Sequence, residues 1–127
     1  MITCIAVDDE PMALEVIERY CAKSDLVDLK AVFREPVKAI EYLTRERIDL
    51  VFLDINMPDI SGMQLVQTLS PKPMIIFTTA YSHYAVESYN LNAIDYLLKP
   101  ITFERFLASI SKALTTLRAA GDVARAL

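Results

Sequence analysis

The sequence lacks the features that mark several common classes of protein. It has no apolar run long enough to span a membrane, and its first residues, Met1-Ile2-Thr3, do not begin a secretory signal peptide. Its formal net charge is −4 and its lysines and arginines form no cluster, which argues against nucleic-acid binding by this stretch of chain. We therefore expect a protein without membrane contact.

Cysteine and glycine are scarce as well. The two cysteines, Cys4 and Cys21, have no motif spacing and fall in apolar stretches, so we expect buried thiols, a reducing compartment and a cytoplasmic location. Flavin and nucleotide binders of the α/β class need a phosphate loop rich in glycine, serine or threonine after the first strand. Here that loop is Asp8-Asp9-Glu10, whose charges would repel phosphate unless a metal ion were bound.

What the sequence does contain is a regular alternation of short apolar runs and amphipathic stretches. Its 127 residues and 54% hydrophobic content suit one domain whose sheet is covered on both sides. Strands are expected at residues 2–7, 29–33, 50–53, 74–77 and 93–98, and helices near Pro11, Pro36, Ser61 (as N-cap), Ser82 and Phe103. This alternation predicts an α/β fold with a doubly wound, five-stranded parallel sheet and helices on both faces.

The last helix is the clearest amphipathic pattern and is expected at residues 103–117. After about Arg118 the sequence turns into small residues around Gly121, which indicates a frayed end. We assign residues 1–120 to the folded domain and residues 121–127 to a tail or the start of a linker.

Polar side chains stand where the predicted strands end. They are Asp8, Asp9, Asp54, Thr78, Thr79 and Lys99. Because the carboxyl ends of parallel strands share one edge of a sheet, these side chains can meet although they lie far apart in sequence. Three carboxylates packed together raise one another's pKa, and a hard divalent cation with oxygen ligands relieves that repulsion. The pattern therefore predicts a Mg²⁺ site.

Asp54 is the candidate functional residue, because it follows a strand that reads as buried on both faces. A carboxylate can accept a phosphoryl group as an aspartyl phosphate. Mg²⁺ and Lys99 would supply positive charge to the phosphoryl oxygens, and Thr79 would supply a hydrogen bond. Aspartate is also common in turns, but Asp8, Asp9 and Lys99 as companions argue against that simpler interpretation.

Four segments resemble the receiver domain of two-component response regulators. They read VDDE (Val7 to Glu10), LDINMPDISG (Leu53 to Gly62), TTA (Thr78 to Ala80) and YLLKP (Tyr96 to Pro100), and the resemblance extends to about Leu117. It implies the flavodoxin-like strand order 2-1-3-4-5. It also implies that the protein is a phosphoacceptor that assists its own phosphorylation and dephosphorylation, and not an enzyme.

The resemblance also implies a role for each matching residue. Asp54 would receive phosphate from a phosphohistidine on a sensor histidine kinase. The metal ligands would be Asp9 directly, Asp8 largely through water, Asp54, and Asn56 through its backbone carbonyl. Glu10 is expected beside these acids without binding the metal. Thr79 would be the switch hydroxyl, and Tyr96 would change rotamer with it. Lys99 would pair with the phosphate, and the Lys99–Pro100 bond would be cis.

A narrower resemblance concerns residues 81–100, which look like those of the LytTR-type regulators. That similarity implies a DNA-binding domain downstream, with transcription as output, and contact with DNA only through that domain. Homodimerisation is expected through the surface formed by residues 82–117. His83, the only histidine, is expected to be an exposed helix residue, with phosphotransfer or metal binding as the alternative.

Two other functions remain to be weighed. A haloacid-dehalogenase-type phosphatase also forms an aspartyl phosphate, but it usually places a second acid two residues after the nucleophile, where this chain has Asn56. Such an enzyme would also need a cap over its substrate, and none is evident. A degenerate receiver that only binds a partner is disfavoured, because all the expected active residues are present.

Overall fold

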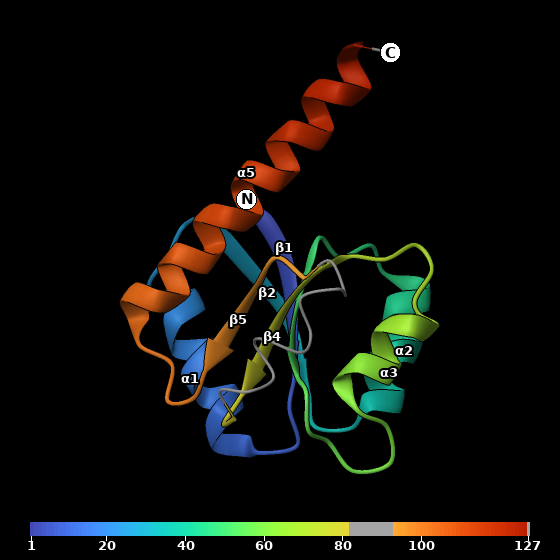
Figure 1. Ribbon diagram of the computed structural model, residues 1–127, viewed down its shortest axis with the longest axis vertical. Coiled ribbons are helices and arrows are strands. Elements are labelled where there is room, and N and C mark those ends of the chain that lie inside the picture. Colours follow the sequence, from blue (N-terminus) through green and yellow to red (C-terminus); the bar gives the residue numbers. More distant parts are fainter. Residues whose placement is uncertain (82–92, 127) are drawn as a thin grey trace.

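The computed structural model describes residues 1–81 and 93–126 (Figure 1). Its elements are β1 (Ile2–Val7), α1 (Pro11–Ala22), β2 (Val27–Phe33), α2 (Pro36–Arg45), β3 (Leu50–Asp54), α3 (Gly62–Thr68), β4 (Met74–Thr79), β5 (Asp95–Leu98) and α5 (Phe103–Ala126). The strands form one five-stranded sheet in the order β2-β1-β3-β4-β5, and every pair is parallel. The predicted fold class and strand order are confirmed.

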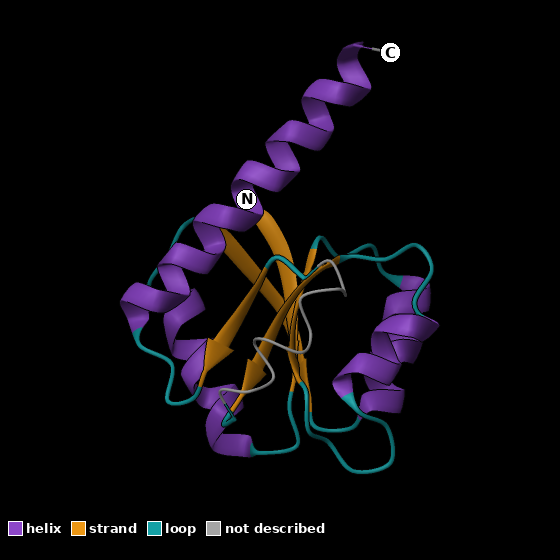
Figure 2. Ribbon diagram, viewed as in Figure 1, coloured by secondary structure: helices purple, strands orange, loops and turns teal. Residues whose placement is uncertain are grey.

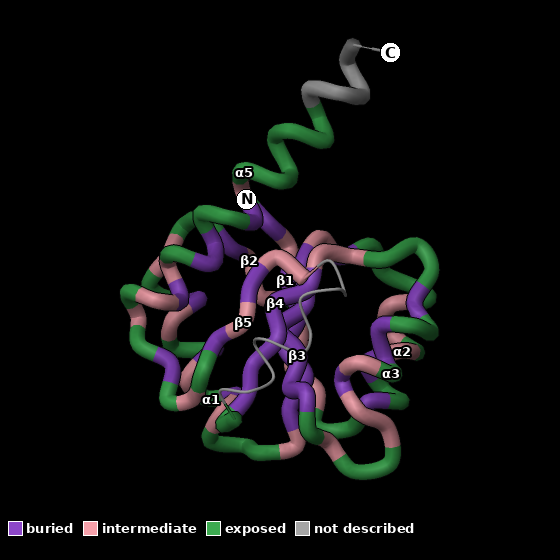
Figure 3. The backbone as a smooth tube through the Cα atoms, in the orientation of Figure 1, coloured by how far each residue is buried: buried purple, intermediate pink, exposed green. Residues whose placement is uncertain are grey.

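Helices cover both faces of this sheet (Figure 2). One core lies under α1 and α5 and includes Phe52, Ile76 and Phe106. The other lies under α2 and α3 and includes Leu53 and Phe77. Successive residues of a strand point to opposite faces, so a strand covered on both sides must be apolar throughout. This explains the continuous apolar runs in the sequence, and Figure 3 shows the central strands buried along their length.

The helix starts follow local sequence signals. Proline stands in the first turn of α1 and of α2, where its missing N–H is not needed. Ser61 caps α3, as predicted: its hydroxyl accepts from the Gln64 N–H at 3.2 Å, and the Gln64 side chain accepts from the Ser61 N–H at 2.9 Å. This reciprocal pair fixes where the loop after Asp54 ends.

The C-terminal helix differs from the prediction. The frayed end expected after about Arg118 is wrong, since α5 continues to Ala126 and extends beyond the body of the domain (Figure 1). Alanine favours helix strongly, and a single glycine such as Gly121 costs a helix only about 1 kcal/mol. In addition, β2 begins at Val27, two residues before its expected start. The helix expected at residues 82–90, with His83, lies outside the described residues.

The two thiols are buried and free, as predicted. The hydrogen bond to Cys21 and the burial of the side chain raise the pKa of the Cys4 thiol well above its usual range. A thiol of this kind is inert, because the thiolate is the reactive form. Among the described residues, no helix has the length and apolar character needed to cross a membrane.

Gly62 provides a test of how the fold holds the loop after Asp54. A Cβ at this position would overlap the Asp54 carbonyl oxygen and lie 3.0 Å from the Ile55 Cα. We expect Gly62→Ala to lower the free energy of unfolding by about 1–3 kcal/mol, because backbone atoms must move apart. Urea titration measures this. Gly121→Ala is the matched control, since nothing lies within 4 Å of a Cβ there; equal stability of the two variants would contradict the prediction.

Candidate functional site

Lys99 connects the acidic side chains at the carboxyl ends of the strands. Its Nζ lies 2.9 Å from Asp8 Oδ2, 3.5 Å from Glu10 Oε1 and 3.7 Å from Asp54 Oδ1. Asp8 and Asp54 are only 4% and 3% exposed, so the pairs of Lys99 with these two residues lie largely away from water, whereas Glu10 is exposed. The structure thus brings together residues from the ends of β1, β3 and β5, as the sequence predicts.

Four carboxylates form a cluster here: Asp8, Asp9, Glu10 and Asp54 each offer an oxygen within 4.8 Å of the others. The sequence interpretation placed Glu10 beside the acids, and the structure adds its contact with Lys99. An all-oxygen set of anionic groups suits a hard divalent cation such as Mg²⁺. The residues present therefore fit the metal that the sequence predicts.

Backbone groups hold the acidic side chains in place. The Glu10 N–H donates to Asp8 Oδ1 at 2.9 Å, and the Asn56 N–H donates to Asp54 Oδ1 at 3.3 Å. Arg34, at the end of β2, donates from Nε and Nη2 to the Asp9 carbonyl oxygen at 3.4 and 3.3 Å. The two loops that carry the cluster are thereby tied to the sheet edge.

The electrostatics reflect this crowding. Burial and the negative charge of Asp8 raise the pKa of Asp54 to about 7, although Lys99 and the Asn56 N–H act in the opposite direction. Burial lowers the pKa of Lys99, but the hydrogen bond to Asp8 and the nearby carboxylates outweigh it, so the net shift is upward. Lys99 is therefore a fixed positive charge beside a carboxyl group that ionises only with difficulty.

Thr79 and Tyr96 occupy different surroundings from the acids. The Thr79 hydroxyl is buried and accepts from the Tyr81 N–H at 3.0 Å. The Tyr96 ring stacks on Phe77 with centroids 5.5 Å apart. Thr78, which is among the polar residues predicted at this sheet edge, is the register partner of Asp54 in the β3–β4 ladder.

The turn after β5 carries Lys99. The Lys99–Pro100 peptide bond is cis, as the resemblance implied, and the Lys99 N–H donates to the Thr79 carbonyl at 2.7 Å. A hollow of about 330 Å³ lies between this turn and α1, and Tyr20, Thr78, Lys99 and Ile101 line part of it.

An ion-pair network near this turn escaped the sequence analysis. Arg105 of α5 binds Asp95 of β5 with two contacts of 2.6 and 2.7 Å, and the Ser109 hydroxyl donates to Asp95 at 2.6 Å. Arg105 also donates to the Tyr96 carbonyl at 3.2 Å. Burial raises the pKa of Asp95, but these hydrogen bonds outweigh it and hold that pKa well below its usual range. Arg105 and Ser109 are four residues apart and so lie on one face of a helix; this spacing is the sequence feature that could have indicated the network.

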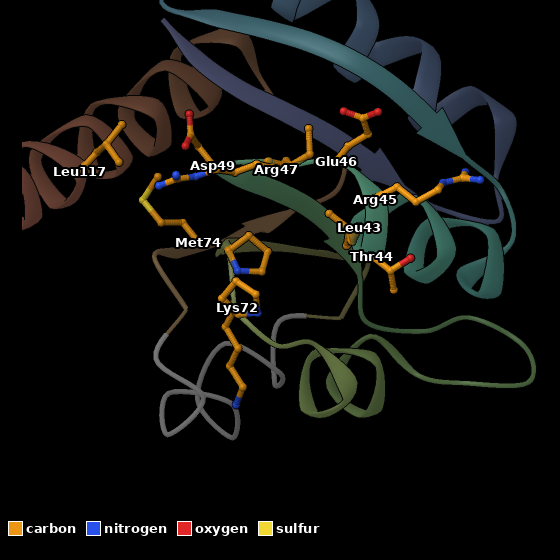
Figure 4. A pocket seen from close by; sticks show the side chains of 12 residues that line it. Leu43, Thr44, Arg45, Glu46, Arg47, Asp49, Lys72, Met74 and Leu117 are labelled. Atoms are coloured by element: carbon orange, nitrogen blue, oxygen red, sulfur yellow. The ribbon is translucent and has the colours of Figure 1, made fainter.

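A second hollow, of about 540 Å³, lies at the opposite edge of the sheet (Figure 4). It is bordered by the segments before β3 and β4 and by Leu117 of α5. Its basic side chains do not converge, since Arg45 and Lys72 point in different directions. The acidic cluster therefore remains the candidate site for phosphoryl chemistry.

Comparisons with known proteins agree with this geometry. The family model of the response regulator receiver domain matches residues 4–111. The transcriptional regulatory protein BtsR of Escherichia coli (strain K12) is 38% identical over 114 residues, which cover 88% of this chain and 48% of BtsR. The chain spans about half the length of the curated relatives it matches.

Solved structures give the same result. The response regulatory domain of protein mrkE from Klebsiella pneumoniae is similar with a TM-score of 0.82 and 29% identity, covering 93% of this chain and 99% of that chain. The response regulator protein TrrA from Thermotoga maritima, solved in complex with Mg²⁺-BeF, has a TM-score of 0.77 and 28% identity, covering 89% and 99%.

The raised pKa of Asp54 predicts a pH effect on stability in metal-free buffer. Folded Asp54 keeps its proton up to about pH 7, whereas an unfolded aspartate loses it near pH 3.9. Between those values the folded state binds more protons, so its stability falls as the pH rises. Asp54→Asn lacks this titration, and its stability relative to wild type should rise by up to about 4 kcal/mol from about pH 4 to pH 8.

Urea unfolding in EDTA across this pH range measures the effect. Asp59→Asn is the control, because Asp59 is an exposed loop acid on the same side of the sheet. A difference between Asp54→Asn and wild type that does not vary with pH would show that Asp54 ionises normally in the folded protein.

Proposed function

Because the chain belongs to the response regulator receiver domain family, we propose that Asp54 accepts a phosphoryl group from a phosphohistidine of a sensor histidine kinase. The observation that carries the proposal is the set of contacts around Lys99, whose Nζ lies 2.9 Å from Asp8 and 3.7 Å from Asp54 within the acidic cluster. A positive charge held beside Asp54 supports the proposal, because it would pair with the phosphoryl oxygens.

In the proposed reaction, an Asp54 carboxylate oxygen attacks phosphorus. The new P–O bond forms as the P–N bond of the phosphohistidine breaks, and the leaving imidazole keeps the electron pair. The nearly complete burial of Asp54 limits competition from water. Lys99 favours the ionised form of Asp54 and then pairs with the added phosphate, since phosphoryl transfer depends mainly on positioning and charge neutralisation.

Mg²⁺ is the proposed cofactor. Asp9, Asp54 and the Asn56 carbonyl would hold it, and Asp8 would act through water. When bound, the ion supplies positive charge to the carboxylates and the phosphoryl oxygens. The donor set of the cluster supports this assignment, and TrrA, 28% identical, was solved with Mg²⁺-BeF.

We further propose that the domain acts as a switch and has no substrate of its own to turn over. Phosphate on Asp54 would draw the Thr79 hydroxyl away from the Tyr81 N–H, and Lys99 towards the phosphate. Tyr96 would follow by changing rotamer, and the surface formed by residues 82–117 would change shape. Such a change is a shift in population between two states.

The output of the switch is proposed to be homodimerisation through that surface and transcription through a LytTR-type DNA-binding domain downstream. The proposal of a further domain with a role in transcription is supported by relatives that are named transcriptional regulatory proteins and are about twice as long as the matched segment.

Acetyl phosphate with Mg²⁺ tests the phosphoacceptor. We expect wild type to gain the mass of one phosphoryl group, labile in acid and in alkali, and Asp54→Asn to gain none. The matched control Asp59→Asn should behave as wild type, because Asp59 is an exposed loop residue. No modification of wild type, or modification of Asp54→Asn to the same extent, would exclude Asp54 as the acceptor.

Lys99→Ala separates phosphorylation from switching. We expect it to be phosphorylated about tenfold more slowly, because one positive charge near the phosphoryl oxygens is lost. The phosphorylated variant should fail to dimerise in sedimentation velocity, and Lys72→Ala, at the opposite edge of the sheet, should dimerise normally. Dimerisation of phosphorylated Lys99→Ala at the wild-type affinity would mean that Lys99 does not couple the two events.

A further inference from the structure

The turn that carries Lys99 is held on two sides. Before the turn, the Lys99 N–H donates to the Thr79 carbonyl of β4 at 2.7 Å. After it, the Tyr20 hydroxyl donates to the Ile101 carbonyl at 2.7 Å. Tyr20 belongs to α1, so this second bond links residues that are 81 positions apart in the chain.

The Tyr20 hydroxyl is itself fixed in position. Its ring packs against Phe103 and Phe106 of α5, with centroids 5.3 and 5.5 Å apart. An aromatic side chain held by two neighbouring rings cannot easily leave its rotamer, so the packing sets the position of its hydroxyl oxygen.

Packing fixes the turn only in part: Ile101 is buried in the core under α1 and α5, but another side of the turn borders a hollow. The hollow of about 330 Å³ between α1 and the turn borders Lys99, Pro100 and Ile101. The turn therefore has room to move if the Tyr20 bond is lost. The Lys99 ammonium group contacts Asp8, Glu10 and Asp54 from the present position of the turn, so a shift of the turn would change these distances unless the flexible side chain compensated for it.

We propose that Tyr20 is a positioning residue for the phosphotransfer: its hydroxyl holds the turn after β5 and thereby keeps the Lys99 ammonium group between Asp8 and Asp54. This inference rests on the proposed function of Asp54. It assigns a role in the reaction to a side chain that does not touch the reacting atoms.

Tyr20→Phe removes the hydroxyl and keeps the ring. With acetyl phosphate and Mg²⁺, we expect phosphorylation of this variant to be about three- to tenfold slower, which corresponds to one hydrogen bond. The Mg²⁺ affinity should not change, because other groups hold the acidic cluster. Tyr42→Phe is the matched control, since Tyr42 packs against Phe33 and the core on the other face of the sheet.

A double-mutant cycle distinguishes positioning from a general loss of stability. If Tyr20 acts through Lys99, Tyr20→Phe should not slow phosphorylation further in the Lys99→Ala background. An equal slowing in both backgrounds, or a wild-type rate for Tyr20→Phe, would overturn the inference while the role of Asp54 stands.

A measurement without phosphorylation tests the same point. The Lys99 ¹³Cε resonance, assigned by its loss in Lys99→Ala, should shift in Tyr20→Phe and stay in place in Tyr42→Phe. An unchanged resonance in Tyr20→Phe would show that Lys99 does not depend on the Tyr20 bond. Absence of phosphorylation of wild type would instead remove the proposed function.

Discussion

The repulsion among the carboxylates at the sheet edge is the constraint on which the rest of the structure depends. The cluster offers one carboxylate oxygen from each of four residues, all within 4.8 Å of one another: Asp8, Asp9, Glu10 and Asp54. In the part of the chain that the structure describes, Lys99 is a cation that contacts three of them. Fully ionised, four negative charges would face one positive charge, and burial makes that imbalance costlier. The raised pKa of Asp54 is the visible result. A divalent cation and a phosphoryl group would enter such a site together more readily than either would alone.

Keeping like charges together requires a rigid support, and the central strands provide it. Asp8 and Asp54 follow or end β1 and β3, which are neighbours in the sheet and are covered on both faces. A close-packed core on each side gives these strands little freedom to move apart. The α3 capping box and the close approach of Gly62 to the Asp54 carbonyl then fix the loop that would otherwise relieve the crowding.

Much of this could be predicted from the sequence, for a physical reason. Strands buried on both faces leave continuous apolar runs, and parallel strands bring their carboxyl ends to one edge, so the sequence alone predicts that Asp54 and Lys99 lie together. Contacts between side chains could not be placed in this way. The bond from Tyr20 to Ile101 and the pairing of Asp95 with Arg105 depend on how α1 and α5 pack against the sheet. The length of α5 is not evident from the sequence, because small residues around a glycine are typical of a frayed end, whereas alanine also favours helix.

The edge strand β5 is a weak element, and the proposed switch would depend on it. It has four residues, pairs with β4 alone in the described sheet, carries Tyr96 and is followed directly by Lys99. An edge strand of this length has little stability of its own. Arg105 holds the Tyr96 carbonyl and Asp95, while Thr79 and Tyr20 hold the turn that follows. Because the backbone is held at both ends of β5, the side chains of Lys99 and Tyr96 could change rotamer in response to a phosphate on Asp54 while the strand stays in place. The signal would then be transmitted by changes of side-chain rotamer, while the Asp95–Arg105 pair keeps α5 in its position against β5.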